Sequence, residues 1–195
     1  MRTQSVLFVL LFTICYMLGT SQSVFFGDFN LQGFLKTREP IWTFNTTSVS
    51  KRLCVVTIPE KESEERIAYK FMYYDQSAHK VSLEMEGKFR KSSGMYAGPR
   101  GKPKVYVYKV AYYDKLFQCA VIKISPVSTT YGKPWYELQV WDMYLERREP
   151  SMSCREHFHK VARHGHAIYN PTCHNILPKM SPPAQKALKR RNSLH

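Results

Sequence analysis

The sequence lacks any apolar run long enough to cross a bilayer as a helix, which needs about 20 consecutive apolar residues. Its most apolar stretch, Val6–Leu18, is shorter than that, and no later segment comes close. It also contains no G-x-S-x-G motif, no C-x-x-C pair and no internal repeat. These absences argue against a serine hydrolase and a zinc knuckle. We therefore expect no membrane span, no enzyme, no cofactor and no metal site.

The apolar stretch has the features of an export signal. It follows Arg2 and precedes the small residues Ser21 and Ser23, an order typical of a secretory signal peptide that is cleaved after Ser23. We expect residues 1–23 to be this signal, 24–176 to be one domain, and 177–195 to be a basic, disordered tail. The protein is then secreted and extracellular, and we expect a monomer.

Four cysteines remain after the signal, namely Cys54, Cys119, Cys154 and Cys173. An even number on an oxidising export route predicts two disulfides, and the spacing alone leaves three pairings open. The sequon Asn45-Thr46-Thr47 predicts glycosylation of Asn45 on an exposed turn.

The formal net charge is +14, and the segment after Leu177 carries five basic residues and no acidic one. Such a field favours sulfated glycans or other anionic partners, including a host protein that contacts the tail. The alternative is that the charge only keeps the protein soluble. We do not expect nucleic-acid binding, because no recognition motif accompanies the basic residues and the chain is exported.

Alternation of apolar and polar residues predicts strands over most of the exported chain. The expected strands are 41–46, 52–58, 67–74, 81–86, 104–113, 117–124 and 135–144. Tyr106, Tyr108, Val110 and Tyr112 are expected on one face of their strand. Helices are expected over 29–37 and from Ser153, which would cap the second helix before Gly165 ends it. Seven or eight strands joined by short turns indicate an all-β barrel or sandwich.

Several motifs in this order resemble the tick salivary lipocalins, the histamine-binding protein family. They are Ile41-Trp42-Thr43-Phe44-Asn45-Thr46-Thr47, Cys54, Cys119-Ala120-Val121, Tyr136-Glu137-Leu138-Gln139-Val140, Cys154 with Phe158, and Ile168-Tyr169 before Cys173. The resemblance spans residues 42–173. It implies an eight-stranded antiparallel lipocalin-like barrel with a short N-terminal helix and a C-terminal flanking helix. It also implies the pairings Cys54–Cys173 and Cys119–Cys154, and sequestration of a small host mediator by a salivary protein.

The chain departs from the pattern of the amine-binding members in two places. Ala120 stands where those members have an acidic residue, and Gln139 replaces an aromatic residue after Glu137-Leu138. Strand alternation puts Trp135, Glu137, Gln139 and Trp141 on one face, beside an inward-facing Ala120. The expected ligand-binding residues are Glu137, Trp42, Trp135, Tyr106, Tyr108, Phe71, Gln139 and Ala120.

Three hypotheses for the partner follow from these residues. The missing carboxylate and the positive charge favour a lipid mediator such as an eicosanoid. Glu137 and Trp42 leave a biogenic amine, histamine or serotonin, as the second. The third is a protein-binding immunomodulator directed at complement or a host cell surface through the basic tail.

Overall fold

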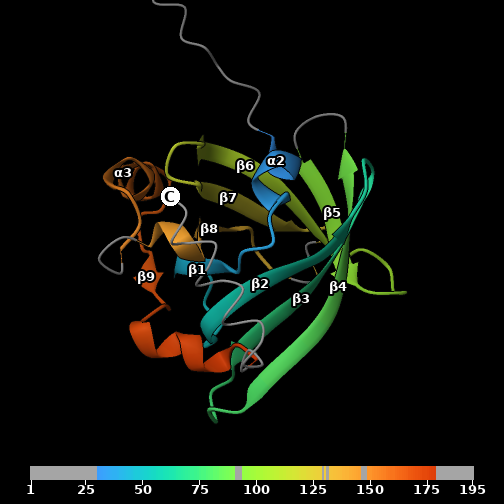
Figure 1. Ribbon diagram of the computed structural model, residues 1–195, viewed down its shortest axis with the longest axis horizontal. Coiled ribbons are helices and arrows are strands. Elements are labelled where there is room, and N and C mark those ends of the chain that lie inside the picture. Colours follow the sequence, from blue (N-terminus) through green and yellow to red (C-terminus); the bar gives the residue numbers. More distant parts are fainter. Residues whose placement is uncertain (1–29, 91–93, 129, 131, 146–148, 179–195) are drawn as a thin grey trace, which may run out of the picture.

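The computed structural model describes residues 30–90, 94–128, 130, 132–145 and 149–178. Eight antiparallel strands form a closed barrel, in which each strand pairs with the next and β1 pairs with both β2 and β8 (Figure 1). The strands are β1 (Ile41–Thr46), β2 (Leu53–Glu62), β3 (Arg66–Tyr74), β4 (Lys80–Arg90), β5 (Gly94–Pro99), β6 (Tyr106–Asp114), β7 (Cys119–Pro126) and β8 (Trp135–Trp141). This confirms the expected lipocalin-like barrel. Strand β5 was not among the strands expected from the sequence, because Gly94 and Gly98-Pro99 are residues typical of turns.

A short N-terminal helix closes one end of the barrel. Helix α2 (Leu31–Leu35) begins at Asn30, whose side chain accepts from the backbone N–H of Gln32, and it packs against β5 and β6. Its residues Leu31, Phe34 and Leu35 are buried inside the barrel end. The Gln32 side-chain amide holds the helix to the carbonyl oxygens of residues 63 and 64 in the β2–β3 turn.

The C-terminal helix flanks the outside of the barrel. Helix α3 (Met152–Val161) contacts β6, β7 and β8. The expected cap was wrong by two residues, since Ser151 caps the helix while the Ser153 hydroxyl donates to Asp114. The helix also ends before Gly165, which has a different role: a Cβ there would lie 2.4 Å from the Phe158 ring. No helix of the described ranges is long and apolar enough to cross a bilayer.

The segment after α3 returns along the barrel and fills a gap between β1 and β2. Strand β9 (His166–Ala167) pairs with the end of β1. The next residue, Ile168, donates to the Phe44 carbonyl and accepts from the Cys54 N–H, so it bridges two strands that have diverged. A 3-10 helix, η4 (Pro171–Ile176), then packs on β2 and β3. A second short 3-10 helix, η2 (Asp142–Tyr144), follows β8.

Two disulfides fix this C-terminal region to the barrel. Their pairings, Cys54–Cys173 and Cys119–Cys154, are those that the family resemblance implied. The first joins η4 to the start of β2, and the second joins α3 to the start of β7. Both lie in an outer apolar core between the barrel wall and the C-terminal segments, together with Trp42, Leu138 and Phe158.

We predict that the double substitution Cys119→Ser and Cys154→Ser lowers the free energy of unfolding by about 4 kcal/mol, because it removes a crosslink across 35 residues. Denaturant unfolding followed by circular dichroism measures the change. Met152→Ala is the control, since that side chain is exposed on the same helix. An unchanged unfolding free energy in the double variant would show that packing alone holds α3 in place.

Candidate ligand-binding site

The barrel lumen is a second core, separate from the outer one. Alternation along each strand sends every other side chain inward, and the closed sheet brings these side chains together. Apart from the α2 residues, the buried members of this lumen cluster are Ile41, Ile67, Tyr69, Met85, Met95, Ala97, Ala120, Ile122 and Ile124. Aromatic side chains, among them Phe71, Tyr106, Tyr108 and Trp135, pack against them. The lumen is therefore mainly apolar and aromatic.

One carboxylate, that of Glu137, lies inside this apolar surrounding and is 8% exposed. Its Oε1 atom accepts from the Trp135 indole N–H at 2.8 Å. Its Oε2 atom accepts from the Gln139 amide at 2.7 Å and from the Thr43 hydroxyl at 3.1 Å. All three donors are neutral, no lysine or arginine lines the cavity beside Gln139, and none of the salt bridges among the described residues involves Glu137. The lumen thus holds an acidic group whose hydrogen bonds are satisfied but whose charge has no cationic partner beside it.

Two tyrosines from non-adjacent strands of the barrel both line the lumen near this carboxylate. Tyr69 comes from β3 and Tyr108 from β6, and both line the central cavity. Burial raises the pKa of the Tyr69 phenol far above its ordinary value, although a hydrogen-bonding interaction with the Tyr108 phenol opposes part of this rise and the negative charge of Glu137 adds to it. Burial and the neighbouring Tyr69 and Glu137 raise the pKa of Tyr108 in the same direction. Both phenols therefore stay protonated at physiological pH.

One cavity inside the lumen, between α2 and the strand side chains, is small. It has a volume of about 10 Å³ and is lined by Leu31, Leu35, Thr57, Tyr69, Phe71, Met95, Tyr108, Ile122 and Gln139. Such a volume has room for about one water molecule. A ligand larger than water therefore needs the walls to move, and the leucines of α2 are the part of the lining that a separate element contributes.

The structure places most of the predicted site residues in or around the lumen. Glu137, Gln139, Trp135 and Ala120 lie on adjacent strands β7 and β8, as alternation predicted. Phe71, Tyr106 and Tyr108 also face the lumen. Trp42 does not: it lies in the outer core, where its indole N–H donates to Asp142 at 2.6 Å and its ring packs on Tyr169. Trp42 is therefore not part of the lumen site.

Two further expectations were wrong for local reasons. A bulge in β6 between Val110 and Tyr112 shifts the alternation, so that Tyr113 packs on the lumen cluster. Tyr112 instead stacks on His157 of α3, outside the barrel. Asn45 lies within β1, half-buried and paired with both β8 and β9, rather than on an exposed turn. Its glycosylation stays a prediction.

Sequence reasoning missed Thr43 and Tyr69. Tyr69 shares the inward face of β3 with Phe71, which is a signal that could have indicated it. Nothing in the sequence indicated Thr43, because its approach to Glu137 depends on the pairing of β1 with β8, where Thr43 lies opposite Gln139.

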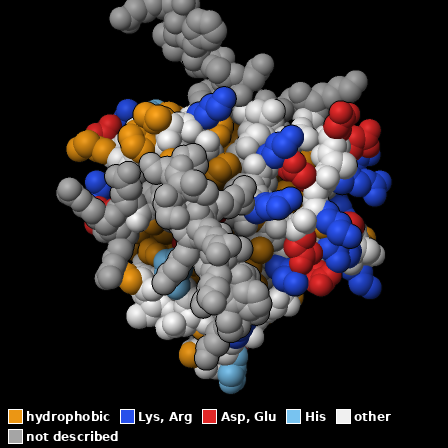
Figure 2. Space-filling view, in the orientation of Figure 1, with side chains coloured by type: hydrophobic (Ala, Val, Ile, Leu, Met, Phe, Trp, Pro, Cys, Tyr) orange, Lys and Arg blue, Asp and Glu red, His pale blue; other side chains and the backbone are white. Residues whose placement is uncertain are grey.

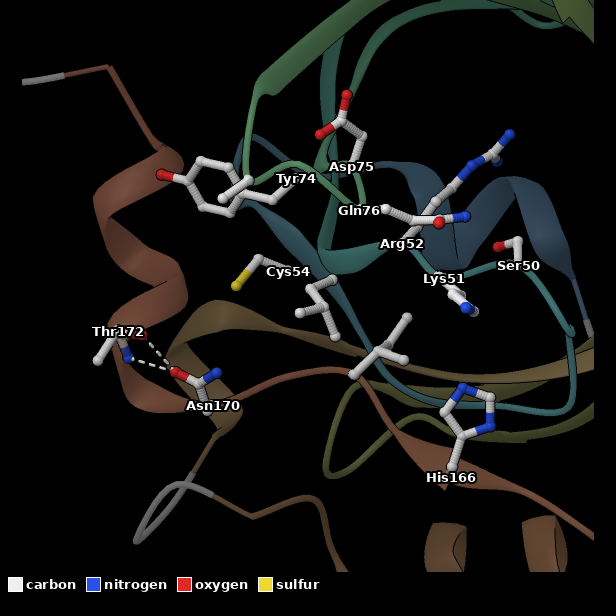
Figure 3. A pocket seen from close by; sticks show the side chains of 13 residues that line it. Ser50, Lys51, Arg52, Cys54, Tyr74, Asp75, Gln76, His166, Asn170 and Thr172 are labelled. Atoms are coloured by element: carbon white, nitrogen blue, oxygen red, sulfur yellow. Dashed lines mark hydrogen bonds between the residues drawn. The ribbon is translucent and has the colours of Figure 1, made fainter.

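A larger groove lies outside the lumen, between the β1–β2 connection, the β3–β4 turn and the C-terminal segment (Figure 3). Its volume is about 650 Å³ and it is open to solvent. Two of its polar side chains are engaged locally, since Asn170 caps η4 and Asp75 accepts from the backbone N–H groups of Ser77 and His79. Most of the others are exposed, among them those of Lys51, Gln76 and His166. The groove therefore lacks the buried, converging polar groups that are typical of a ligand site.

Several basic residues on the outer wall form ion pairs with neighbouring acidic residues. Figure 2 shows basic and acidic side chains interleaved on one side of the molecule. On this wall Lys70 pairs with Glu60, Arg100 with Glu60 and Glu84, and Lys104 with Glu86. This part of the wall is therefore not a continuous basic surface. The basic tail, residues 179–195, and the expected signal peptide both lie outside the described residues.

Comparison with known proteins supports the fold. Japanin from Rhipicephalus appendiculatus, solved bound to cholesterol, matches 70% of this chain and 96% of its own, with a TM-score of 0.52 and 10% identity. Lobster apocrustacyanin A1 matches 72% of this chain and 79% of its own, with a TM-score of 0.50 and 7% identity. No family profile and no curated protein sequence matches the chain. Membership of the tick histamine-binding family therefore stays a prediction.

We predict that stability falls as the pH rises above about 10, where the tyrosines of an unfolded chain ionise. The raised pKa values of Tyr69 and Tyr108 keep both phenols protonated in the fold, so the unfolded state binds fewer protons there and gains stability relative to the fold. Denaturant unfolding at a series of pH values measures the slope. A variant with Tyr69→Phe and Tyr108→Phe should show a shallower decline, whereas Tyr96→Phe, on the barrel exterior beside Arg90, should not. Equal slopes for both would contradict the assignment.

Proposed function

We propose that the protein is a secreted carrier that sequesters one small host mediator in the barrel lumen, and that this mediator is a protonated aromatic amine. The observation that carries the proposal is the buried Glu137 carboxylate, which is surrounded by neutral donors and aromatic walls. The two disulfides are consistent with an oxidising, extracellular compartment. Eight-stranded barrels are of a size that can hold one small ligand.

The charge of the lumen favours a cation. Burying an ammonium group is costly unless a charged or hydrogen-bonding partner meets it, and Glu137 supplies that partner. Trp135 and Tyr106, which pack edge to face with ring centroids 5.6 Å apart, offer aromatic surface beside it. Aromatic faces attract cations, and this attraction is stronger in a desolvated site. An anionic headgroup placed at the same depth would instead meet a like charge.

An eicosanoid is the second candidate, and Arg52 is the residue that favours it. Its guanidinium lies 4.7 Å from the centroid of Tyr73 and 6.0 Å from that of Phe71, at the end of the barrel away from α2. A fatty-acid carboxylate could bind there while its chain enters the lumen, and cholesterol in the Japanin structure is a precedent for an apolar ligand in a similar fold. Such a ligand needs far more volume than the present cavity provides. The sequence led us to favour this lipid class, and the carboxylate of Glu137 inside the lumen now leads us to place the amine first.

We predict that Glu137→Gln weakens amine binding by at least about thirtyfold, because the buried ammonium loses its charged partner. Titration calorimetry with histamine, serotonin and a leukotriene measures the change. Glu84→Gln is the matched control, because Glu84 lies on the outer wall and pairs with Arg100. It should bind as the unchanged protein does.

The same panel separates the two candidates. Binding of the leukotriene alone, with loss of affinity in Arg52→Ala, would replace the amine with the lipid mediator. No heat with any of the three compounds, from protein that circular dichroism shows to be folded, would argue against the carrier function itself.

We further predict that Leu35→Ala increases ligand affinity and lowers stability together. Leu35 lines the cavity and is 5% exposed, so its truncation leaves space for a ligand and costs about 2–5 kcal/mol of unfolding free energy. Leu138→Ala, in the outer core, should lower stability by a similar amount without raising affinity. If both variants bind alike, α2 does not limit the volume available to the ligand.

A further inference from the structure

We propose that Tyr69 and Tyr108 form a neutral polar subsite, which binds an uncharged hydrogen-bonding group on the ring of the amine. The inference rests on the proposed amine-binding function and goes beyond it, because it assigns a second contact and names the ligand class: an aromatic amine whose ring carries a hydroxyl group. Glu137 would bind the ammonium, and the tyrosine pair would bind the hydroxyl.

The first observation is a buried hydroxyl whose one polar neighbour is a second phenol, that of Tyr108. Tyr69 is 3% exposed, and within the described chain its hydroxyl oxygen makes no hydrogen bond of acceptable geometry. Buried polar groups are almost always hydrogen-bonded, so one that is not requires an explanation. A ligand group that binds there would supply the missing hydrogen bond.

The second observation is the place of the void. Tyr69 and Tyr108 line the cavity of about 10 Å³, and the remaining polar members of its lining are Thr57 and Gln139. The void therefore has room for one polar atom beside the Tyr69 hydroxyl. Gln139 also donates to Glu137 at 2.7 Å, so the void lies one side chain away from the carboxylate.

The subsite selects for a neutral group. Both phenols stay protonated because burial raises their pKa values, and a phenol can donate as well as accept a hydrogen bond. A second ammonium would find no anion at the tyrosines, and a carboxylate there would be repelled by Glu137. A hydroxyl can accept from one phenol and donate to the other.

Serotonin and tryptamine test the subsite, since they are the same indole amine with and without a ring hydroxyl. We expect the unchanged protein to bind serotonin about tenfold more tightly, the difference that one hydrogen bond in a buried site supplies. Tyr69→Phe should reduce this preference to less than about twofold by weakening serotonin while leaving tryptamine unchanged. Tyr108→Phe should act in the same direction. Tyr96→Phe makes the same chemical change outside the lumen and should keep the preference.

Stability gives a second readout. Tyr69→Phe removes an unsatisfied hydroxyl, so this variant should unfold at the same temperature as the unchanged protein or a higher one. A lower unfolding temperature would mean that the hydroxyl has a structural partner, and this would overturn the subsite. Equal binding of the two amines by the unchanged protein, or a preference that persists in Tyr69→Phe, would also overturn it while leaving amine binding intact. If neither amine binds, the proposed function fails, and the subsite fails with it.

Discussion

Closure of the eight-stranded sheet is the constraint on which the rest of the structure depends. Once β1 pairs with both β2 and β8, each strand residue faces either the lumen or the outside. The outward residues then form the outer core with α3 and η4, and the inward ones meet in a narrow space. One shift of alternation exchanges these two environments. The site is therefore determined by which position each side chain occupies along its strand.

This dependence explains which parts of the site the sequence could predict. Alternation in β8 is uninterrupted, so Trp135, Glu137 and Gln139 were placed on the correct face. In β6 a bulge after Val110 reverses the pattern, and no residue type marks it, so Tyr112 was placed on the wrong face. Trp42 was assigned from the family motif rather than from alternation, and its position opposite Val140 puts it in the outer core. The barrel was predicted from the order of the family motifs, because alternation alone missed β5 and left a barrel and a sandwich open.

The sequence placed one acidic residue, Glu137, in the lumen, but the burial of this carboxylate and its three neutral donors could not be read from it. The net charge of +14 suggested an anionic ligand, yet several basic residues of the outer wall pair with acidic neighbours, and the lumen contains a carboxylate. A field summed over the whole chain affects how ligands approach the protein. Recognition depends on the few groups that lose water on binding, and at Glu137 these groups have the opposite sign to the protein as a whole.

The free-energy cost of an empty cavity explains why α2 fills one end of the lumen. An empty apolar cavity costs about 24 cal/mol per Å³, so a preformed space of 150 Å³ would cost roughly 4 kcal/mol. Leu31 and Leu35 of α2 remove this cost by filling the barrel end. Any ligand must then supply enough interaction energy to move them, and an apolar body alone only replaces one apolar contact by another. The polar groups that α2 cannot satisfy, the Glu137 charge and the Tyr69 hydroxyl, are therefore the ones from which a ligand can gain affinity.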